Sequence, residues 1–167
     1  MPEYDYSQQG AYFLTICCHE KYRLLGTIAE DAVHLSAAGK IVDECWRQIL
    51  IHFPNVEAPS FTVMPNHVHG IVVVRRRSAP DARTRVNEST GVSRRLGAHP
   101  SGSIPVIVRS FKSITTRQIR ESLRDSNVVV WQRGYYERVI RDEKEFWDTC
   151  EYIRMNPANW ATDEENS

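Results

Sequence analysis

PNHVHGIVVV, residues 65–74, places two histidines at the start of a run of apolar, mostly β-branched residues. Successive side chains of a strand point to opposite faces, so His67 and His69 would lie side by side on one face. Beyond the histidines both faces are apolar, which is typical of a strand buried on both sides. The segment therefore predicts a central strand over residues 67–74, with two imidazoles pointing the same way at its beginning.

The residues around this strand predict an alternation of strands and helices. Pro65-Asn66 is a compact turn signal that would join the histidine-bearing strand to the strand before it. Apolar residues spaced three and four apart indicate two helices, and β-branched or aromatic residues indicate the other strands. In chain order the predicted elements are strand 11–18, helix 36–52, strands 57–64 and 67–74, helix 104–124, and extended segments 128–131 and 135–140.

That order corresponds to the ferredoxin-like βαββαβ sandwich, an α+β fold with a four-stranded antiparallel sheet and helices on one face. The first and third strands of this plan are central, which agrees with the apolar faces of the histidine-bearing strand. An extra C-terminal helix follows, since Asp142 and Glu145 resemble a capping box and Pro157 disfavours helical geometry before it. We expect one domain over residues 1–167, with a frayed tail at 161–167.

Composition and cysteine usage limit the class of protein. The chain has 167 residues, of which 41% are hydrophobic and 25% charged, as in ordinary globular domains. No apolar run reaches the ~20 residues of a membrane-spanning helix, and the polar, acidic beginning does not resemble a secretory signal. The four cysteines form no C-x-x-C pair, which favours free thiols in a reducing compartment. We therefore expect a cytoplasmic protein.

The net charge of zero conceals a strong local asymmetry. Residues 75–124 contain twelve basic and three acidic side chains, and eleven of the twelve are arginines, which suit bidentate phosphate contacts. Within this segment, residues 75–103 lack apolar periodicity and predict a flexible Arg-rich loop inside the domain. Such an asymmetry suggests a polyanionic ligand, although a solvated surface would have the same composition. The helix 104–124 contributes the candidate binding residues Arg109, Lys112, Arg117 and Arg120.

The two histidines form the first part of a candidate metal site. Neutral imidazole is the commonest metal ligand in proteins, and two imidazoles on one strand face can converge on one ion. Two histidines at a polar strand end without a metal would give the same pattern, so a third ligand is needed to support a metal site. On the predicted C-terminal helix, Tyr152 and Asn156 are four residues apart and share a face. Taken alone, such a tyrosine is usually a half-buried packing residue, and an asparagine before proline usually ends a helix.

Three motifs follow one another along the chain: PNHVHG at 65–70, WQ at 131–132 with YYE at 135–137, and EYIRMNP at 151–157. In this order they resemble the motifs of the single-tyrosine HUH transposases, and most closely those of the REP-associated tyrosine transposases. Each motif by itself is weak evidence for this family, but the occurrence of all three in this order is specific for it. The similarity extends from about Tyr12 to Trp160, which is nearly the whole chain.

The resemblance implies a DNA transposase, a single-strand endonuclease and ligase that works through a 5′-phosphotyrosine intermediate. His67 and His69 would bind a divalent metal, Asn156 would complete the site, and Tyr152 would be the nucleophile. The metal would be Mg²⁺ or Mn²⁺, because hard cations polarise phosphates and histidine ligands also suit manganese. The substrate would be hairpin-flanked single-stranded DNA, whose phosphates the basic segment 75–124 would contact. The resemblance allows a monomer or a homodimer.

Two other functions fit parts of the pattern. A non-catalytic single-stranded nucleic-acid-binding protein of RRM-like fold would use the sheet and the basic helix without cleavage. Its third strand would carry stacking aromatic residues, where this sequence has histidines. A metal-dependent hydrolase would use water in place of the Tyr152 hydroxyl. Of the three, a covalent adduct with DNA is expected only of the transposase.

Overall fold

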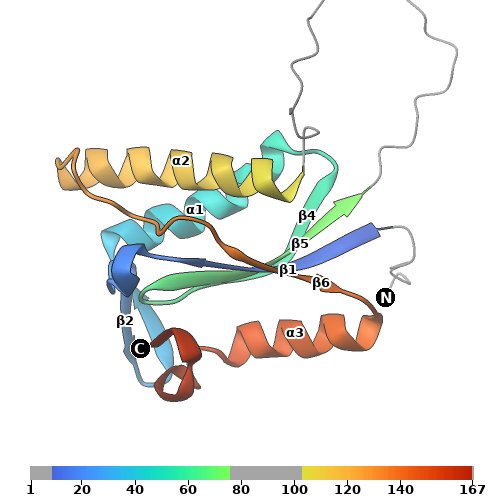
Figure 1. The fold of residues 1–167 in the computed structure, drawn as a ribbon. Helices are drawn as coiled ribbons and strands as arrows, with labels where there is room; N and C mark the ends of the chain where they lie inside the picture. Colours follow the sequence, from blue (N-terminus) through green and yellow to red (C-terminus); the bar gives the residue numbers. More distant parts are fainter. Residues whose placement is uncertain (1–8, 76–102, 167) are drawn as a thin grey trace, which may run out of the picture.

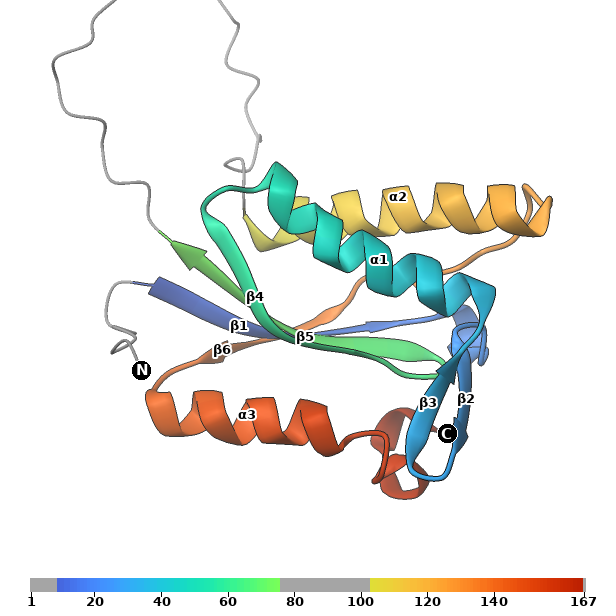
Figure 2. The ribbon, with the colours of Figure 1, turned by 180° about the vertical axis from the view of Figure 1, so that it is seen from behind.

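The computed structural model describes residues 9–75 and 103–166. In these residues one antiparallel sheet lies between two helical layers (Figure 1). The helices α1 (Ala37–His52) and α2 (Ile104–Leu123) cover one face, and α3 (Glu143–Met155) covers the other, as the view from behind also shows (Figure 2). The flexible loop predicted for residues 75–103 lies, except at its two ends, outside the described residues.

The sheet has the strand order that the ferredoxin-like fold requires. Its order is β4-β5-β1-β6, and every neighbouring pair is antiparallel. The first and third strands of the βαββαβ unit are therefore the two central ones, as predicted from the sequence. The strands of this sheet are β1 (Gln9–Cys17), β4 (Val56–Val63), β5 (His67–Arg75) and β6 (Tyr136–Ile140).

Strand β5 is buried on both faces because its side chains alternate between two separate cores. Val68 and Val72 belong to the core beneath α1 and α2. Ile71 and Val73 belong to a smaller core beneath α3. The histidines share the face of this second core, so the local alternation in the sequence places both imidazoles on the α3 side of the sheet.

Helix α1 begins and packs as its sequence indicates. The Ser36 hydroxyl accepts a hydrogen bond from the Gly39 N–H (3.1 Å), which caps α1. Trp46 of α1 stacks on Phe61 of β4 with ring centroids 4.3 Å apart. A Cβ atom at Gly70 would lie 2.8 Å from the Trp46 ring, so glycine permits this close packing of α1 on β5.

The segment predicted to be extended at residues 128–131 is not a strand of the sheet. Its one ladder contact is an isolated bridge between Trp131 and Cys18. Side chains of α2 hold it in place, because the Trp131 indole N–H donates to the Thr115 hydroxyl at 2.9 Å. Val130 and Trp131 are buried in the larger core. The apolar residues of this segment are therefore buried in the core, and the segment does not pair as a strand.

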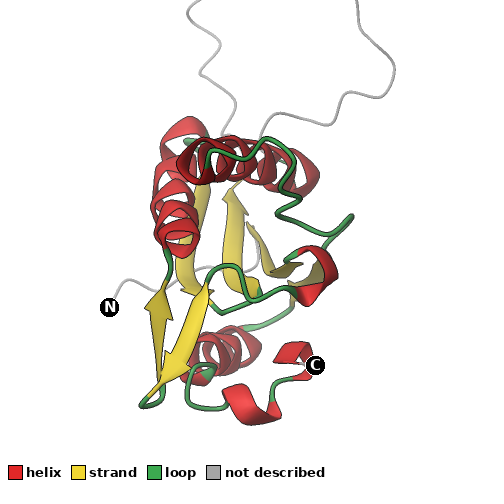
Figure 3. Cartoon of the chain, turned by 90° about the vertical axis from the view of Figure 1, so that its left-hand side faces the viewer, coloured by secondary structure: helices red, strands yellow, loops and turns green. Residues whose placement is uncertain are grey.

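The hairpin of β2 (Gly26–Ala29) and β3 (Ala32–Leu35) forms a separate two-stranded sheet. Figure 3 shows it below the main sheet, on the same side as α3. No helix among the described residues is long and apolar enough to cross a membrane. All four cysteines are free thiols, in agreement with the absence of a C-x-x-C pair.

Residues 161–166 correct the prediction of a frayed tail at 161–167, whose last residue lies outside the described residues. Two 3₁₀ turns follow α3, Trp160–Thr162 and Glu164–Asn166. The Asn66 side-chain amide donates to the Glu165 carbonyl oxygen at 2.6 Å, and an Arg23 guanidinium N–H donates to the Asn166 side-chain oxygen at 2.9 Å. The polar composition suggested solvation, but these long-range hydrogen bonds hold the turns against the end of the sheet where β5 begins.

Candidate active site

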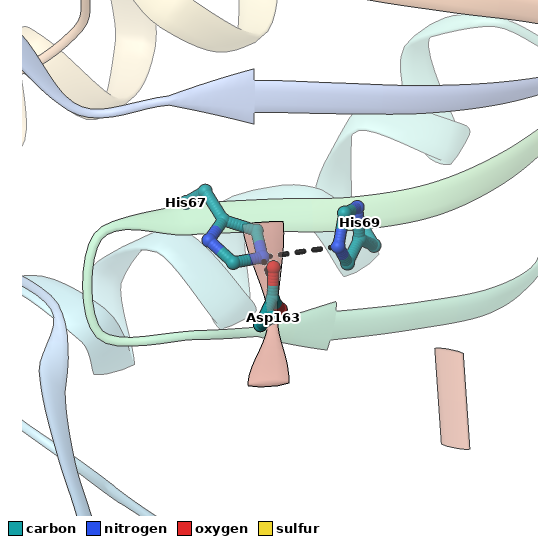
Figure 4. Close-up of side chains that lie close together, drawn as sticks. All are labelled: His67, His69 and Asp163. Carbon is teal, nitrogen blue, oxygen red and sulfur yellow. Dashed lines mark hydrogen bonds and ion pairs between the residues drawn. The ribbon is translucent and has the colours of Figure 1, made fainter. Parts of the chain in front are cut away.

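The side chains of His67 and His69 on β5 point toward each other, and their Nε2 atoms lie 3.0 Å apart (Figure 4). Both side chains are buried, and burial lowers the pKa of each to about 3. The imidazoles are therefore neutral at physiological pH, which is the form that binds metal ions. The structure thus brings both sequence-predicted ligands to one point.

The outer ring nitrogens of the two histidines are held by neighbouring side chains. His67 Nδ1 lies 2.8 Å from the Asn66 Oδ1 atom, and His69 Nδ1 lies 2.9 Å from the Thr15 hydroxyl. The amide nitrogen of Asn66 donates to Glu165, so its oxygen faces His67 and accepts from Nδ1–H. This tautomer leaves a lone pair on His67 Nε2, directed into the site.

Asp163 supplies a carboxylate that sequence analysis missed. Its Oδ2 atom lies 3.7 Å from His67 Nε2, and its side chain is 1% exposed. That oxygen has no hydrogen-bond partner among the described residues. One ligand atom from each of His67, His69 and Asp163 lies within 4.8 Å of the others, so the group could hold a metal ion. Asp163 lies in the predicted tail, where no local pattern distinguishes it from the neighbouring acidic residues.

Tyr152 and Asn156 share the inner face of α3, as their spacing predicted. The Tyr152 ring lies 5.4 Å from the His69 ring and 6.0 Å from the Phe13 ring, yet the residue is 47% exposed. Asn156 is buried, and its Oδ1 atom has no hydrogen-bond partner among the described residues. A buried oxygen without a partner fits a ligand position, because such an atom is costly unless something satisfies it.

The ionisation of Tyr152 depends on its charged surroundings. Burial raises the pKa of the phenol, the negative charge of Asp163 raises it further, and a hydrogen bond from Asn156 lowers it. The residue is therefore a neutral phenol in the metal-free protein. A cation beside it would lower this pKa and favour the phenolate.

An open pocket of about 600 Å³ is lined by His69, Tyr152 and Asp163, while His67 and Asn156 are not among its lining residues. His69 and Asp163 lie on its inner wall, and α3 contributes Tyr152. The strand β6 contributes Tyr136 and Arg138 to the outer wall. A pocket of this size can take a small part of a polymer, such as one nucleotide with its phosphate.

Helix α2, which carries the predicted basic binding residues, lies on the opposite face of the sheet from α3 (Figure 1). The Lys112 ammonium donates to the carbonyl oxygens of Gln132 (2.9 Å) and Gly134, and Arg120 Nε donates to the Val128 carbonyl oxygen at 2.9 Å. These two predicted binding residues therefore hold the segment 128–134 against α2. Arg109 and Arg117 are exposed.

A second pocket, of about 670 Å³, runs between α2 and the segment that Lys112 and Arg120 hold. Lys112, Arg117, Arg120 and Arg133 line it, so four cationic side chains face one groove. Arg109 is not among its lining residues. The structure thus brings three of the four predicted binding residues together and adds Arg133.

Comparisons of the sequence find relatives in Haemophilus influenzae. An uncharacterized protein of that organism is 36% identical over 165 residues, covering 98% of this chain and 89% of that protein. A second H. influenzae protein, named as a candidate REP-associated tyrosine transposase, is 24% identical over 154 residues, which cover 92% of this chain and 73% of that protein. No family model matches the sequence.

Comparisons of the fold find transposases among solved structures. A REP-associated tyrosine transposase bound to a REP hairpin superposes with a TM-score of 0.59 at 18% identity, covering 96% of this chain and 74% of that one. A candidate transposase from Deinococcus radiodurans superposes with a TM-score of 0.51 at 16% identity, covering 92% and 95%. These relatives support a transposase function. In sequence and in fold, the chain is close to the REP-associated tyrosine transposase family.

Proposed function

We propose that this protein is a metal-assisted transposase that cleaves and rejoins single-stranded DNA beside a hairpin, with Tyr152 as the nucleophile. The observation that carries the proposal is the position of Tyr152. Its ring is half-exposed in an open pocket and lies 5.4 Å from His69, next to a cluster that could hold a metal. The fold neighbour that is bound to a REP hairpin supports hairpin DNA as the partner.

The reaction follows from what the chain offers at this point. The Tyr152 oxygen would attack the phosphorus, forming the tyrosyl O–P bond while the bond from phosphorus to the 3′ oxygen breaks. The phenolic proton passes to solvent, which reaches the half-exposed side chain, and the departing 3′ oxygen takes up a proton. The bond energy is kept in the 5′-phosphotyrosine, so a second 3′-OH can reverse the step without ATP.

The residues around Tyr152 fit a divalent cation. His67, His69 and Asn156 would hold it, and the Asp163 carboxylate would add a negatively charged ligand. Nitrogen and oxygen donors suit Mn²⁺ as well as Mg²⁺. When bound, such a cation polarises the scissile phosphate and stabilises charge in the transition state. The hydrogen bond that His67 Nδ1–H donates to Asn66 Oδ1, and the hydrogen bond between His69 Nδ1 and the Thr15 hydroxyl, keep the two imidazoles oriented toward it.

Replacing Asp163 by asparagine is expected to lower the affinity for Mn²⁺ by about tenfold or more, because a charged ligand is lost. Asn156→Ala should lower it less, because its oxygen is neutral. The measurement is a titration of the full-length protein with Mn²⁺ followed by electron paramagnetic resonance. Asp148→Asn is the matched control, since this carboxylate lines the same pocket but its side chain is 63% exposed and pairs with Lys144. Equal affinities for the Asp163 variant and wild type would remove Asp163 from the ligand set.

The groove along α2 is the proposed track for the phosphate backbone. Replacing Arg117 and Arg133 by alanine should weaken binding to any hairpin-flanked strand. It should also reduce the slope of log affinity against log salt by roughly one per lost phosphate contact. Fluorescence anisotropy at several salt concentrations measures both. Lys40→Ala, an exposed cation of α1, should change neither. An unchanged slope in the double variant would mean that the groove is only a solvated surface.

A suicide oligonucleotide tests the proposal as a whole. Its cleavage site is nicked so that the short leaving strand diffuses away and the protein stays covalently attached. With Mn²⁺ present, we expect a band that migrates as protein plus DNA on a denaturing gel. Cleavage without this band would indicate a hydrolase that uses water. Binding with no cleavage would indicate the non-catalytic RRM-like alternative.

A further inference from the structure

Tyr136 is an aromatic residue that lines the pocket of His69 and Tyr152, and it has no role in the proposed reaction. It lies on the edge strand β6, and it is 56% exposed although it lines the same pocket as His69 and Tyr152. Exposure of this extent argues against a packing role, because most of its ring surface is not covered by protein. The ring is therefore available for contact with a ligand in the pocket.

The register of the sheet places Tyr136 in line with the metal-binding cluster. Thr15 of β1 pairs with Tyr136 on one side and with His69 on the other. Directly opposed residues in an antiparallel sheet point to the same face, so these three residues form one row across it. Adjacent strands are about 4.8 Å apart, so Tyr136 and His69 are separated by about two strand spacings. This is the distance scale between one nucleotide's phosphate and a neighbouring base.

The other groups near Tyr136 are already engaged. Phe13 is buried and contacts the rings of both His69 and Tyr152. Its contact with the Tyr136 ring is edge-on, with centroids 6.5 Å apart, which supports that ring from one side. Arg138 forms an ion pair with Glu145 and lies over the Phe13 ring. Tyr136 and Tyr152 are thus the exposed aromatic residues among the described residues that line this pocket.

We propose that Tyr136 is a stacking platform for a nucleobase adjacent to the scissile phosphate. This inference rests on the proposed function, because it takes single-stranded DNA as the ligand of the pocket. A tyrosine ring stacks on any base, and the bases of a single strand are free to turn toward it. Stacking would hold the strand so that its phosphate lies beside Tyr152 and the histidines. Tyr136 is then a positioning residue and not part of the chemistry.

The test uses a hairpin-flanked oligonucleotide in which 2-aminopurine replaces one nucleotide at a time on either side of the cleavage position. At one position, fluorescence should be quenched by wild-type protein and by Tyr136→Phe, which keeps the ring. The signal should stay unquenched with Tyr136→Leu. The affinity of Tyr136→Leu for the oligonucleotide should fall by about tenfold.

An abasic site at that same position supplies the second arm. The abasic site should lower the affinity of wild-type protein for the oligonucleotide by about tenfold. It should leave the affinity of Tyr136→Leu almost unchanged, because this variant has already lost the stacking ring. Trp147→Leu is the matched control, since Trp147 is 54% exposed and does not line the pocket. If Tyr136→Leu unfolds, Tyr136→Thr is used in its place in both experiments, because a β-branched residue is well tolerated in a strand.

The outcomes separate this inference from the proposed function. If the abasic site lowers the affinity of wild type and of Tyr136→Leu by the same factor, the stacking role is wrong, even where wild type still forms the covalent adduct. Position-specific quenching that depends on the Tyr136 ring, in a protein that forms no adduct, would retain the stacking role and remove the transposase mechanism. With saturating oligonucleotide, Tyr136→Leu should still form the adduct but more slowly than wild type, because the Tyr152 hydroxyl is intact while the strand is no longer held by stacking.

Discussion

Tyr152→Phe is expected to fold and bind hairpin DNA as wild type does, and to form no covalent adduct. The substitution removes only the phenolic oxygen and leaves a ring of nearly the same shape. Ring contacts with Phe13 and His69 would therefore survive, and a packing role would be preserved. A nucleophile would not survive, because the oxygen that bonds to phosphorus is gone. The measurement is adduct formation on the suicide oligonucleotide with Mn²⁺, with DNA affinity and melting temperature measured alongside.

Two other tyrosines serve as controls for this experiment. Tyr135→Phe and Tyr136→Phe should both keep the adduct, because neither hydroxyl attacks phosphorus in the proposed mechanism. Tyr135 is partly buried against the larger core, it does not line the pocket that holds His69 and Tyr152, and its pKa is raised to about 12 by burial and by Glu137. An adduct that persists in Tyr152→Phe and disappears in one of these two would assign the nucleophile to that residue.

His67→Ala and His69→Ala should each reduce cleavage by about a thousandfold or more, while hairpin binding stays largely intact. Losing one ligand of a proposed two-histidine site removes the electrostatic stabilisation of the phosphate, which is worth several kcal/mol in other metal-assisted reactions. Cleavage under limiting Mn²⁺ is the measurement, and Mn²⁺ affinity should fall in parallel.

The exposed His34 of β3 provides the matched control for the histidine variants. His34→Ala removes an imidazole far along the chain from β5 and should cleave at the wild-type rate. Thr15→Val keeps both histidines but removes the partner of His69 Nδ1, so an intermediate loss of about 10- to 100-fold is expected. Wild-type cleavage by either alanine variant under limiting Mn²⁺ would contradict the metal assignment.

The sequence was sufficient to predict features that depend on neighbouring residues. Alternation along residues 67–74 predicted a strand buried on both faces with its histidines together, and the structure confirms both. Helical spacing predicted that Tyr152 and Asn156 share a face. The order of elements predicted the ferredoxin-like sheet with β1 and β5 at its centre. These features follow from periods of two and 3.6 residues, which any short stretch of chain displays.

The tertiary structure decided which distant residues meet, because burial and hydrogen bonding across the fold leave no local pattern. Asp163 looked like part of a solvated acidic tail, yet long-range hydrogen bonds bury its carboxylate beside His67. Lys112 belonged to a basic face, yet it holds the backbone at Gln132 and Gly134. Tyr136 lies in one row with His69 only because Thr15 pairs with both. Strand register, the packing of the segment 128–134 on α2 and the path of the chain after α3 set these contacts, and all three depend on residues far apart in the chain.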